Sequence, residues 1–276
     1  MPIHNSSTIH PNAVIDEKAI IGKNCRIGPF CYVSSEVVLE DNIELFSHVS
    51  IVGKTFIGNN TKIWPFASIG HQPQDLKYNG EPNELIIGSD NKIRESVSIN
   101  PGTKGGGGLT KIGNECLFML GSHIGHDCKL GNKIILANNF GNKIILANNA
   151  ALAGHVALED RVYIGGLSGV HQFVRIGEGA FIGALSMVTK DVIPFGMVYG
   201  ERAKLMGFNL VGLRRLGVAN KHIKELKGIY KSIFCQSSTL QKRILDINTM
   251  NNPLIQKVLD FIKAEKDRAI LNPYSN

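Results

Sequence analysis

Aliphatic residues recur at every sixth position in the first quarter of the chain. Many are followed by glycine, as at Gly22 and Gly58, and the fourth residue after each is small or β-branched, as at Ala13, Cys25 and Thr61. A period of six fits neither the 3.6-residue repeat of a helix nor the two-residue alternation of a flat strand. It fits short strands joined by tight turns, with three units in each triangular coil, and so predicts a parallel β-helix. The series is Ile3, Ile9, Ile15, Ile21, Ile27, Val33, Leu39, Leu45, Ile51, Ile57, Ile63 and Ile69.

The hexads continue to Val188, with interruptions that predict loops. Ile87 and Ile93 keep the original phase, so residues 70–86 replace or extend whole hexads. The stretch 102–108, with four consecutive glycines, shifts the phase by one. We therefore expect loops near residues 71–86 and 101–110, projecting from a continuous coil.

A third interruption is a duplicated decapeptide. Residues 131–139, GNKIILANN, recur unchanged at 141–149. Because ten is not a multiple of six, both copies cannot stay in register. Looping one copy out costs ordering and closure entropy, whereas keeping both would move every later aliphatic residue off the interior. We expect one copy within 131–150 to be looped out, and two identical strings do not indicate which.

The chain changes character after Pro194. Ile223, Leu226 and Tyr230 recur at helical spacing, and Asn252-Pro253 is typical of an N-cap followed by proline at the first helical position. We expect a β-helix over 1–194 and a helical region over 195–276 with about three helices. Because such a short tail could bury only a small hydrophobic core by itself, we expect it to pack on the end of the coil or on a neighbouring chain.

Cysteine usage and hydropathy limit the location of the protein. Cys25, Cys31, Cys116 and Cys128 occupy the small position of the hexad, which predicts packing residues rather than disulfides or a metal cluster. No apolar run reaches membrane-spanning length, and the first residues lack the basic and hydrophobic regions of a signal peptide. We expect a cytoplasmic protein with no stable membrane insertion.

The positive charge is concentrated in the tail. Residues 1–189 carry 15 Lys and Arg against 16 Asp and Glu, whereas residues 190–276 carry 15 against 7, a net charge of +8. Such an excess is typical of a solvated helix surface or of a docking surface for an acidic partner. Nucleic acid is not expected, because the tail has no recognition motif and few aromatic residues.

Four of the nine histidines fall at coil spacing. With one decapeptide set aside, His155 follows His126 by 19 residues, one coil of 18 plus one, so these histidines should line one side of the prism with His123 and His171. Asp127 follows His126 directly. A carboxylate that accepts a hydrogen bond from one ring nitrogen leaves the other free to take a proton from a hydroxyl. The pattern predicts a general base without a protein nucleophile, since the hexad position points Cys128 inward.

Several strings together resemble the UDP-N-acetylglucosamine O-acyltransferase family over nearly the whole chain: QPQDLKYNGEP at 72–82, IGHDC around His126, LAGHV, VHQF and FNLVGLRRLG. The resemblance implies a mainly β fold with an α tail, a left-handed parallel β-helix followed by a helical region. It also implies a homotrimer with active sites between adjacent subunits. The implied reaction transfers an (R)-3-hydroxyacyl group from acyl carrier protein to the 3-hydroxyl of UDP-N-acetylglucosamine, the first step of lipid A biosynthesis. No cofactor or metal is implied beyond the phosphopantetheine on the carrier, whose acidity would suit the basic tail.

The resemblance also assigns roles to particular residues. It makes His126 the general base, Asp127 its orienting carboxylate and the backbone N–H of Gly154 the donor to the thioester oxyanion. Contacts with sugar, phosphate or acyl chain fall to Asp75, Lys77, His123, His155 and Gln172, with His171 beside them, and contacts with the nucleotide fall to Asn209 and Arg215.

The chain departs from the family pattern at three places. Val211 stands where members carry a glutamate that helps to hold the nucleotide, so recognition of the uridine or ribose would be looser. Ala184 stands where a member that favours long acyl chains has glycine, and an added methyl at the end of an apolar groove would shorten the preferred chain. The duplicated decapeptide is the third departure.

Two other functions remain open. One is an amide-forming acyltransferase acting on a 3-amino UDP-sugar or on a related UDP-glucosamine. A later-step enzyme of that kind normally has an extra N-terminal domain, whereas the hexads here begin at Ile3. The other is a zinc enzyme similar to γ-class carbonic anhydrases, which place three histidines around the metal on the same coils. It is disfavoured because no third ligand shares the spacing of His123 and His126.

Overall fold

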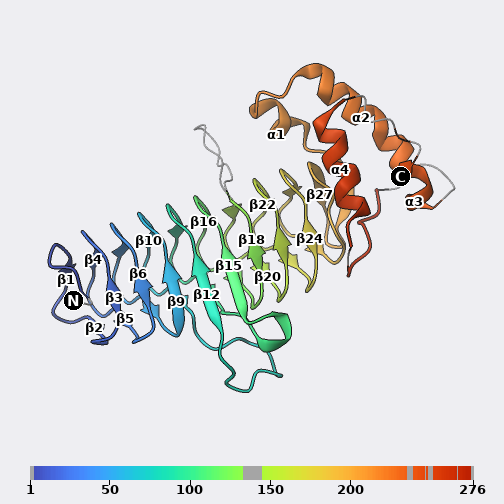
Figure 1. Ribbon diagram of the computed structural model, residues 1–276. Coiled ribbons are helices and arrows are strands. Elements are labelled where there is room, and N and C mark those ends of the chain that lie inside the picture. Colours follow the sequence, from blue (N-terminus) through green and yellow to red (C-terminus); the bar gives the residue numbers. More distant parts are fainter. Residues whose placement is uncertain are drawn as a thin grey trace.

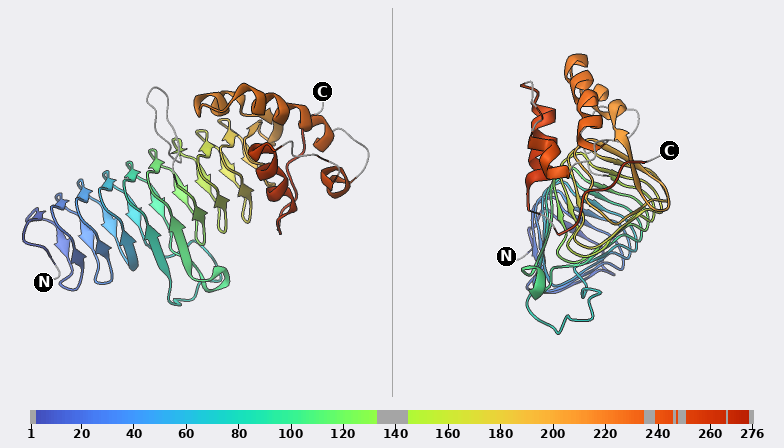
Figure 2. Two further views of the ribbon diagram at one scale, coloured as in Figure 1. Left: turned by 45° about the horizontal axis from the view of Figure 1, so that its top comes forward. Right: turned by 90° about the vertical axis from the view of Figure 1, so that its right-hand side faces the viewer.

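The computed structural model describes residues 3–132, 145–234, 239–245, 247, 251–265 and 267–274. A long three-sided coil runs from the N-terminus, and helices cover its C-terminal end (Figure 1). Seen along its axis, the coil has a triangular outline (Figure 2). The parallel β-helix predicted from the hexads is therefore confirmed.

Three sheets form the faces of the prism, and each strand pairs in parallel with the strand one coil further on. Thr8 pairs with Arg26, a separation of 18 residues. The 11-stranded sheet contains β1 (Thr8–Ile9), β4 (Arg26–Ile27), β7 (Glu44–Leu45), β10 (Lys62–Ile63), β13 (Lys92–Ile93), β16 (Leu117–Phe118), β19 (Ile145–Leu146), β22 (Tyr163–Ile164), β25 (Phe181–Ile182), β27 (Gly196–Tyr199) and the antiparallel β28 (Lys204–Phe208).

The other two faces are a nine-stranded and an eight-stranded sheet. The nine-stranded sheet contains β2 (Val14–Ile15), β5 (Tyr32–Val33), β8 (Ser50–Ile51), β11 (Ser68–Ile69), β14 (Ser98–Ile99), β17 (His123–Ile124), β20 (Ala151–Leu152), β23 (Gly169–Val170) and β26 (Met187–Val188). The eight-stranded sheet contains β3 (Ile20–Ile21), β6 (Val38–Leu39), β9 (Lys54–Ile57), β12 (Glu84–Ile87), β15 (Leu109–Ile112), β18 (Lys129–Leu130), β21 (Ala157–Leu158) and β24 (Arg175–Ile176).

Each hexad works as the sequence predicts. The aliphatic residue ends a strand and fills the prism, as shown by Ile51, Ile57 and Ile63, which are all 0% exposed. The small position is also internal, and the four predicted cysteines are buried and form no disulfide with one another. The glycine after the aliphatic residue permits close approach of successive coils, because a Cβ at Gly22 would lie 2.6 Å from a backbone carbon of the next coil.

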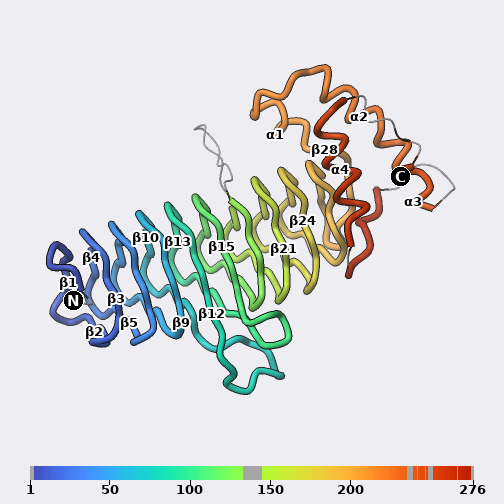
Figure 3. The backbone as a smooth tube through the Cα atoms, viewed as in Figure 1, coloured from blue at the N-terminus to red at the C-terminus, as the bar shows by residue number. Residues whose placement is uncertain are grey.

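Two loops leave the coil at the same corner. The segment between β11 and β12 and the segment between β14 and β15 both connect the nine-stranded to the eight-stranded sheet, and they project together below the coil (Figure 3). The second loop contains a short 3₁₀ helix, η1 (Lys104–Gly106). Both loops were predicted, and their shared corner is also the one that carries His126.

The pairing register shows how the coil accommodates the duplication. Phe118 of β16 pairs with Leu146 of β19, 28 residues on and therefore ten more than one coil. Leu152 and Ile164 in later coils remain fully buried. The ten extra residues therefore leave the register of the later coils unchanged, and the looping out of one copy stays a prediction. Gly131 and Asn132 of the first copy and residues 145–149 of the second lie in the coil, whereas residues 133–144 lie outside the described residues.

The boundary at residue 194 needs correction. Residues 196–208 were assigned to the helical region, but they form β27 and β28, which extend the 11-stranded sheet by a hairpin. This stretch lacks hexad spacing because β28 runs antiparallel, so the repeat gave no signal for it. The helices of the described residues are α1 (Leu210–Arg215), α2 (Asn220–Phe234), α3 (Leu240–Leu245) and α4 (Pro253–Lys263).

The tail is fixed to the coil by specific contacts. The N-cap predicted for α4 is confirmed, because Asn252 Oδ1 accepts the Leu254 N–H at 3.0 Å. Arg175 donates to buried Asp191 at 2.8 Å and lies over the ring of Phe261 in α4 at 4.4 Å. Residues 269–274 then run along the end of the coil, where Ile270 bridges to Asp191. Within the described part of the chain, no helix is long and apolar enough to span a bilayer.

Candidate active site

The site lies at the corner where the nine-stranded sheet passes to the eight-stranded sheet. His126 and Asp127 form the turn between β17 and β18, and Gly154 and His155 form the same turn one coil further on. The His155 N–H donates to the His126 carbonyl at 2.9 Å. The two histidine rings are 5.1 Å apart and nearly perpendicular. The predicted alignment of His126 with His155 is therefore observed.

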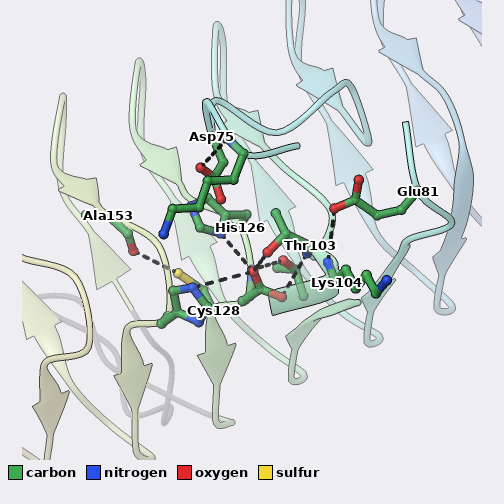
Figure 4. Close-up of polar contacts among 11 residues, drawn as sticks. Asp75, Glu81, Thr103, Lys104, His126, Cys128 and Ala153 are labelled. Atoms are coloured by element: carbon green, nitrogen blue, oxygen red, sulfur yellow. Dashed lines mark hydrogen bonds and ion pairs between the residues drawn. The ribbon is translucent and has the colours of Figure 1, made fainter. Parts of the chain in front are cut away.

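His126 and Asp127 form a buried hydrogen-bonded pair. The Nδ1 atom of His126 lies 2.8 Å from Oδ2 of Asp127, and the two side chains are 8% and 1% exposed. Asp127 has a φ of +59°, and its N–H donates to the Thr110 hydroxyl at 2.8 Å. The turn thus fixes both the backbone and the carboxylate of Asp127, and Figure 4 shows how the surrounding polar groups converge.

Gly154 lies against the free edge of the imidazole. A Cβ built on Gly154 would be 2.4 Å from Nε2 and Cε1 of His126, so only glycine fits there. The Nε2 atom, which is the nitrogen not bonded to Asp127, therefore faces the backbone of Gly154. Nε2 of His126 and the backbone of Gly154 therefore lie close together at this corner.

A pocket of about 660 Å³ opens beside this pair. Its lining includes Asp75 and Lys77 from the first loop, Thr103 and Lys104 from the second, and His155 with Phe173 from the coil. Asp75 Oδ1 accepts the Lys77 N–H at 3.0 Å, which shapes the first loop locally. The structure thus brings two predicted loop residues together with His155.

Burial affects the neighbouring histidines. Desolvation, with a smaller contribution from the charge of His126, lowers the pKa of His123. Desolvation also lowers the pKa of His155, although the charge of Asp127 opposes the effect. Nδ1 of His123 lies 2.8 Å from the Ser98 hydroxyl. Both imidazoles are therefore biased toward the neutral form, which can hydrogen-bond to a polar substrate.

Cys128 is not available as a nucleophile. Its side chain is 0% exposed, and burial raises the pKa of the thiol to about 12. Its Sγ donates to the Ala153 carbonyl at 3.3 Å. Since the thiolate is the reactive form, this cysteine is inert at neutral pH, as its hexad position predicted.

His171 and Gln172 lie one coil beyond His155 and are exposed. Arg268, from the segment after α4, donates to Nδ1 of His171 at 2.9 Å and to the Gln172 carbonyl at 3.0 Å. Because a guanidinium can only donate, Nδ1 of His171 is an acceptor and Nε2 carries the proton. No pattern in the sequence indicated this contact across 97 residues.

Asn209 and Arg215 lie elsewhere, in a second pocket of about 430 Å³ between the 11-stranded sheet and α1. Val211 lines the same pocket. Asn209 is engaged within the chain, because its Oδ1 accepts the Gly212 N–H at 2.9 Å and its Nδ2 donates to the Gly179 carbonyl at 3.1 Å. Within one chain, the predicted nucleotide residues are therefore on a different face from His126.

Ala184 lies outside both pockets. It is exposed at the corner between the 11-stranded and nine-stranded sheets, next to Leu185. Its predicted effect on acyl length would therefore require a second chain to cover this corner.

The same corner also brings possible metal ligands together. His126, Asp127 and His155 have ligand-type atoms within 4.8 Å of one another, and no other such group occurs among the described residues. However, Nδ1 of His126 and Oδ2 of Asp127 are bonded to each other, and Oδ2 also accepts from Thr103 at 2.7 Å. A three-histidine zinc centre is not assembled in the part of the chain that the structure describes.

The fold and this corner are typical of one class, the acyltransferases built of six-residue repeats, and the corner carries a buried histidine–aspartate pair beside an inert cysteine. The acyl-(acyl-carrier-protein)-UDP-N-acetylglucosamine O-acyltransferase of Paracoccus denitrificans is 51% identical over 77% of this chain and 77% of its own length. The enzyme of the same name from Rhizobium johnstonii is 44% identical over 98% of this chain and 97% of its own. The chain belongs to the UDP-N-acetylglucosamine O-acyltransferase family.

Family models and a solved structure agree. The model described as UDP-N-acetylglucosamine O-acyltransferase, domain 2, matches residues 191–271, and the model of the GMPPB C-terminal domain matches residues 1–104. The structure of the UDP-N-acetylglucosamine acyltransferase from Campylobacter jejuni superposes with a TM-score of 0.85 at 36% identity, covering 97% of this chain and 100% of that one. The fold is the left-handed parallel β-helix with a helical C-terminal region that the resemblance implied.

Proposed function

We propose that His126 is the general base with which this acyltransferase moves an (R)-3-hydroxyacyl group from acyl carrier protein to the 3-hydroxyl of UDP-N-acetylglucosamine, the first step of lipid A biosynthesis. The observation that carries the proposal is the buried pair in which His126 Nδ1 lies 2.8 Å from Asp127 while Nε2 faces Gly154. The names of the relatives give the donor and acceptor classes.

The transfer is a direct displacement. Nε2 of His126 takes the proton of the sugar hydroxyl while the hydroxyl oxygen attacks the thioester carbonyl. The Gly154 N–H donates a hydrogen bond to the oxyanion that forms. Asp127 holds the imidazole through Nδ1 and stabilises the imidazolium. When the intermediate collapses, the C–S bond breaks and the imidazolium returns its proton to the phosphopantetheine sulfur. No acyl-enzyme forms, consistent with the inert thiol of Cys128.

The acceptor is proposed to enter the 660 Å³ pocket, where Asp75 and Lys77 offer one acceptor and one cation. His123 and His155, biased toward neutrality by burial, would hydrogen-bond to sugar or phosphate oxygens. The reaction requires no resident cofactor, because the donor brings its own phosphopantetheine.

The functional unit is proposed to be a homotrimer. Asn209 and Arg215 line a pocket on another face of the prism from His126, so they would serve a site only together with a neighbouring chain. Large apolar side chains at the corner near Ala184 are exposed in stacked coils, an arrangement typical of a surface covered by another chain. These residues are Phe30, Phe66, Leu120, Leu167 and Leu185.

A substrate grid tests the function. Acyl carrier protein thioesters of several lengths are assayed against UDP-N-acetylglucosamine and its 3-amino analogue, with purified enzyme checked for bound zinc. Turnover with the hydroxyl acceptor and a 3-hydroxyacyl donor is expected. Preference for the amine would favour the amide-forming alternative, and stoichiometric zinc with carbonic anhydrase activity would favour the metalloenzyme.

The same grid tests Ala184. Removing its methyl in Ala184→Gly should move the preferred donor toward a longer acyl chain if this residue closes the acyl groove in the trimer. An unchanged length profile would show that another residue measures the chain.

A further inference from the structure

Thr103 donates a hydrogen bond to each oxygen of the Asp127 carboxylate. Its N–H donates to Oδ1 at 2.9 Å and its hydroxyl donates to Oδ2 at 2.7 Å. Oδ2 is also the oxygen that lies 2.8 Å from Nδ1 of His126. Thr103 is 3% exposed and Asp127 is 3% exposed, so bulk water does not compete for these bonds. The rotation of the carboxylate, and with it the direction of the bond to His126, therefore depends on Thr103.

The second loop is folded around this contact. The Thr103 carbonyl accepts the N–H groups of Gly106 and Gly108 at 3.0 and 2.8 Å. A Cβ at Gly106 would lie 2.0 Å from the carboxyl carbon of Asp127, so the loop can close over the carboxylate only with glycine there. Close approach to Asp127 thus explains the glycine at 106.

The first loop supports the same arrangement. Oε1 of Glu81 accepts the Lys104 N–H at 3.2 Å, and Oε2 accepts the Asn79 N–H at 2.8 Å. Glu81 therefore ties the loop that carries Asp75 and Lys77 to the residue that follows Thr103 (Figure 4). The first loop thus supports the second, and Thr103 of the second loop binds the Asp127 carboxylate.

We infer that Thr103 is a positioning residue for the reaction: it fixes the Asp127 carboxylate so that Oδ2 directs the imidazole of His126. The inference rests on the proposed function of His126 as the base. The hydroxyl is the group that the test removes, because a change of Thr103 to valine, serine or alanine leaves the backbone N–H in place. Thr103 itself does not touch the substrate's reacting atoms and acts through Asp127.

Four variants test the inference. Thr103→Val keeps the shape and removes the hydroxyl, whereas Thr103→Ser keeps the hydroxyl. We expect Thr103→Val to lower kcat by about 10- to 100-fold, the range typical when a group that orients a reacting side chain is lost, with little change in KM for the UDP-sugar. Thr103→Ser should restore most of kcat. Thr61→Val, at a buried threonine elsewhere in the coil, is the matched control and should keep full turnover.

The fourth variant separates positioning from a general effect on folding. If Thr103 acts only through Asp127, the double variant Thr103→Val with Asp127→Ala should have the same kcat as Asp127→Ala alone. If Thr103→Val does not fold, Thr103→Ala takes its place in both comparisons, since the smaller side chain introduces no clash.

The outcomes distinguish this inference from the function on which it rests. Normal turnover of Thr103→Val, alongside an inactive His126→Ala, would overturn the role of Thr103 and leave the base in place. A further loss in the double variant would also overturn it, because Thr103 would then act independently of Asp127. Normal turnover of His126→Ala would instead remove the proposed function.

Discussion

His123 is the residue whose environment most clearly links pH to stability. Burial, aided by the charge of His126, lowers its pKa below the ordinary value of 6.5. In the unfolded chain the imidazole titrates near that value, so the unfolded state binds the proton first as the pH falls. Neutral His123 therefore makes its full contribution to the free energy of unfolding above about pH 6.5, and this contribution decreases as the pH falls below that value.

The thermal unfolding midpoint should therefore fall between about pH 7 and pH 5, and His123→Gln should flatten this dependence. Ser98→Ala is the control, because it removes the 2.8 Å contact with His123 but leaves the titrating group in place. An equally steep slope in His123→Gln would assign the dependence to other groups, of which His71 and His155 are the candidates, since burial lowers the pKa of each.

At the scale of elements, the duplicated decapeptide tests how strictly the coil keeps its register. Phe118 of β16 pairs with Leu146 of β19, so the sequence between these strands carries ten residues more than one coil. Deleting residues 141–150 leaves one copy and brings Leu152 to the sixth position after Leu136, which restores the hexad spacing. The shortened chain should keep its oligomeric state and activity and unfold at a higher temperature, because a loop need no longer be closed.

Size-exclusion chromatography, calorimetry and the acyl transfer assay would measure the effect of this deletion. A matched deletion of six residues, 141–146, leaves a four-residue excess and should be less stable than the ten-residue deletion. Loss of folding in the ten-residue deletion would mean that both copies are integral to the coil.

The hexads predicted most of these elements because one interior position per six residues determines both the strand and the turn. The strands β27 and β28 were not predicted, because their hairpin does not follow the six-residue repeat and β28 runs antiparallel. His126, Asp127, Gly154 and His155 could be aligned by counting coils. Thr103 could not, because its place in the site depends on how a glycine-rich loop folds back, and no periodicity describes that.

At the scale of the whole molecule, the proposed sharing of sites between chains has a direct consequence. His126→Ala and Arg215→Ala are each expected to be nearly inactive. Coexpressed in equal amounts with different tags, they would form mixed trimers in which about one site in four combines an intact His126 with an intact neighbouring Arg215. Activity should recover toward that fraction in the mixture.

The control for this experiment mixes His126→Ala with Asp127→Ala, whose changes fall in the same half of the site. That mixture should stay inactive. If His126→Ala and Arg215→Ala likewise show no recovery, then Arg215 serves the site of its own chain or no site at all.

The positive charge of the tail predicts that association with acyl carrier protein depends on ionic strength. The net charge of +8 over residues 190–276 should steer an acidic carrier, and Lys190, Arg202 and Lys204 line one recess of about 330 Å³ there. Raising the ionic strength from about 0.05 to 0.5 M should lower kcat/KM for acyl carrier protein by at least about fivefold, and that for acyl-pantetheine far less. Lys221→Glu with Lys224→Glu should act like salt, and Lys18→Glu, at the far end of the coil, should not. Equal salt sensitivity of both donors would mean that the charge only solvates the surface.

The central claim is that His126 removes the proton from the acceptor hydroxyl. The most direct measurement is single-turnover acyl transfer by His126→Ala, together with the Kd for UDP-N-acetylglucosamine from calorimetry. Since a positioned base contributes about 10² to 10⁴ in rate, the transfer step should slow by that factor while the Kd changes little. A transfer rate close to that of the wild type would contradict the account.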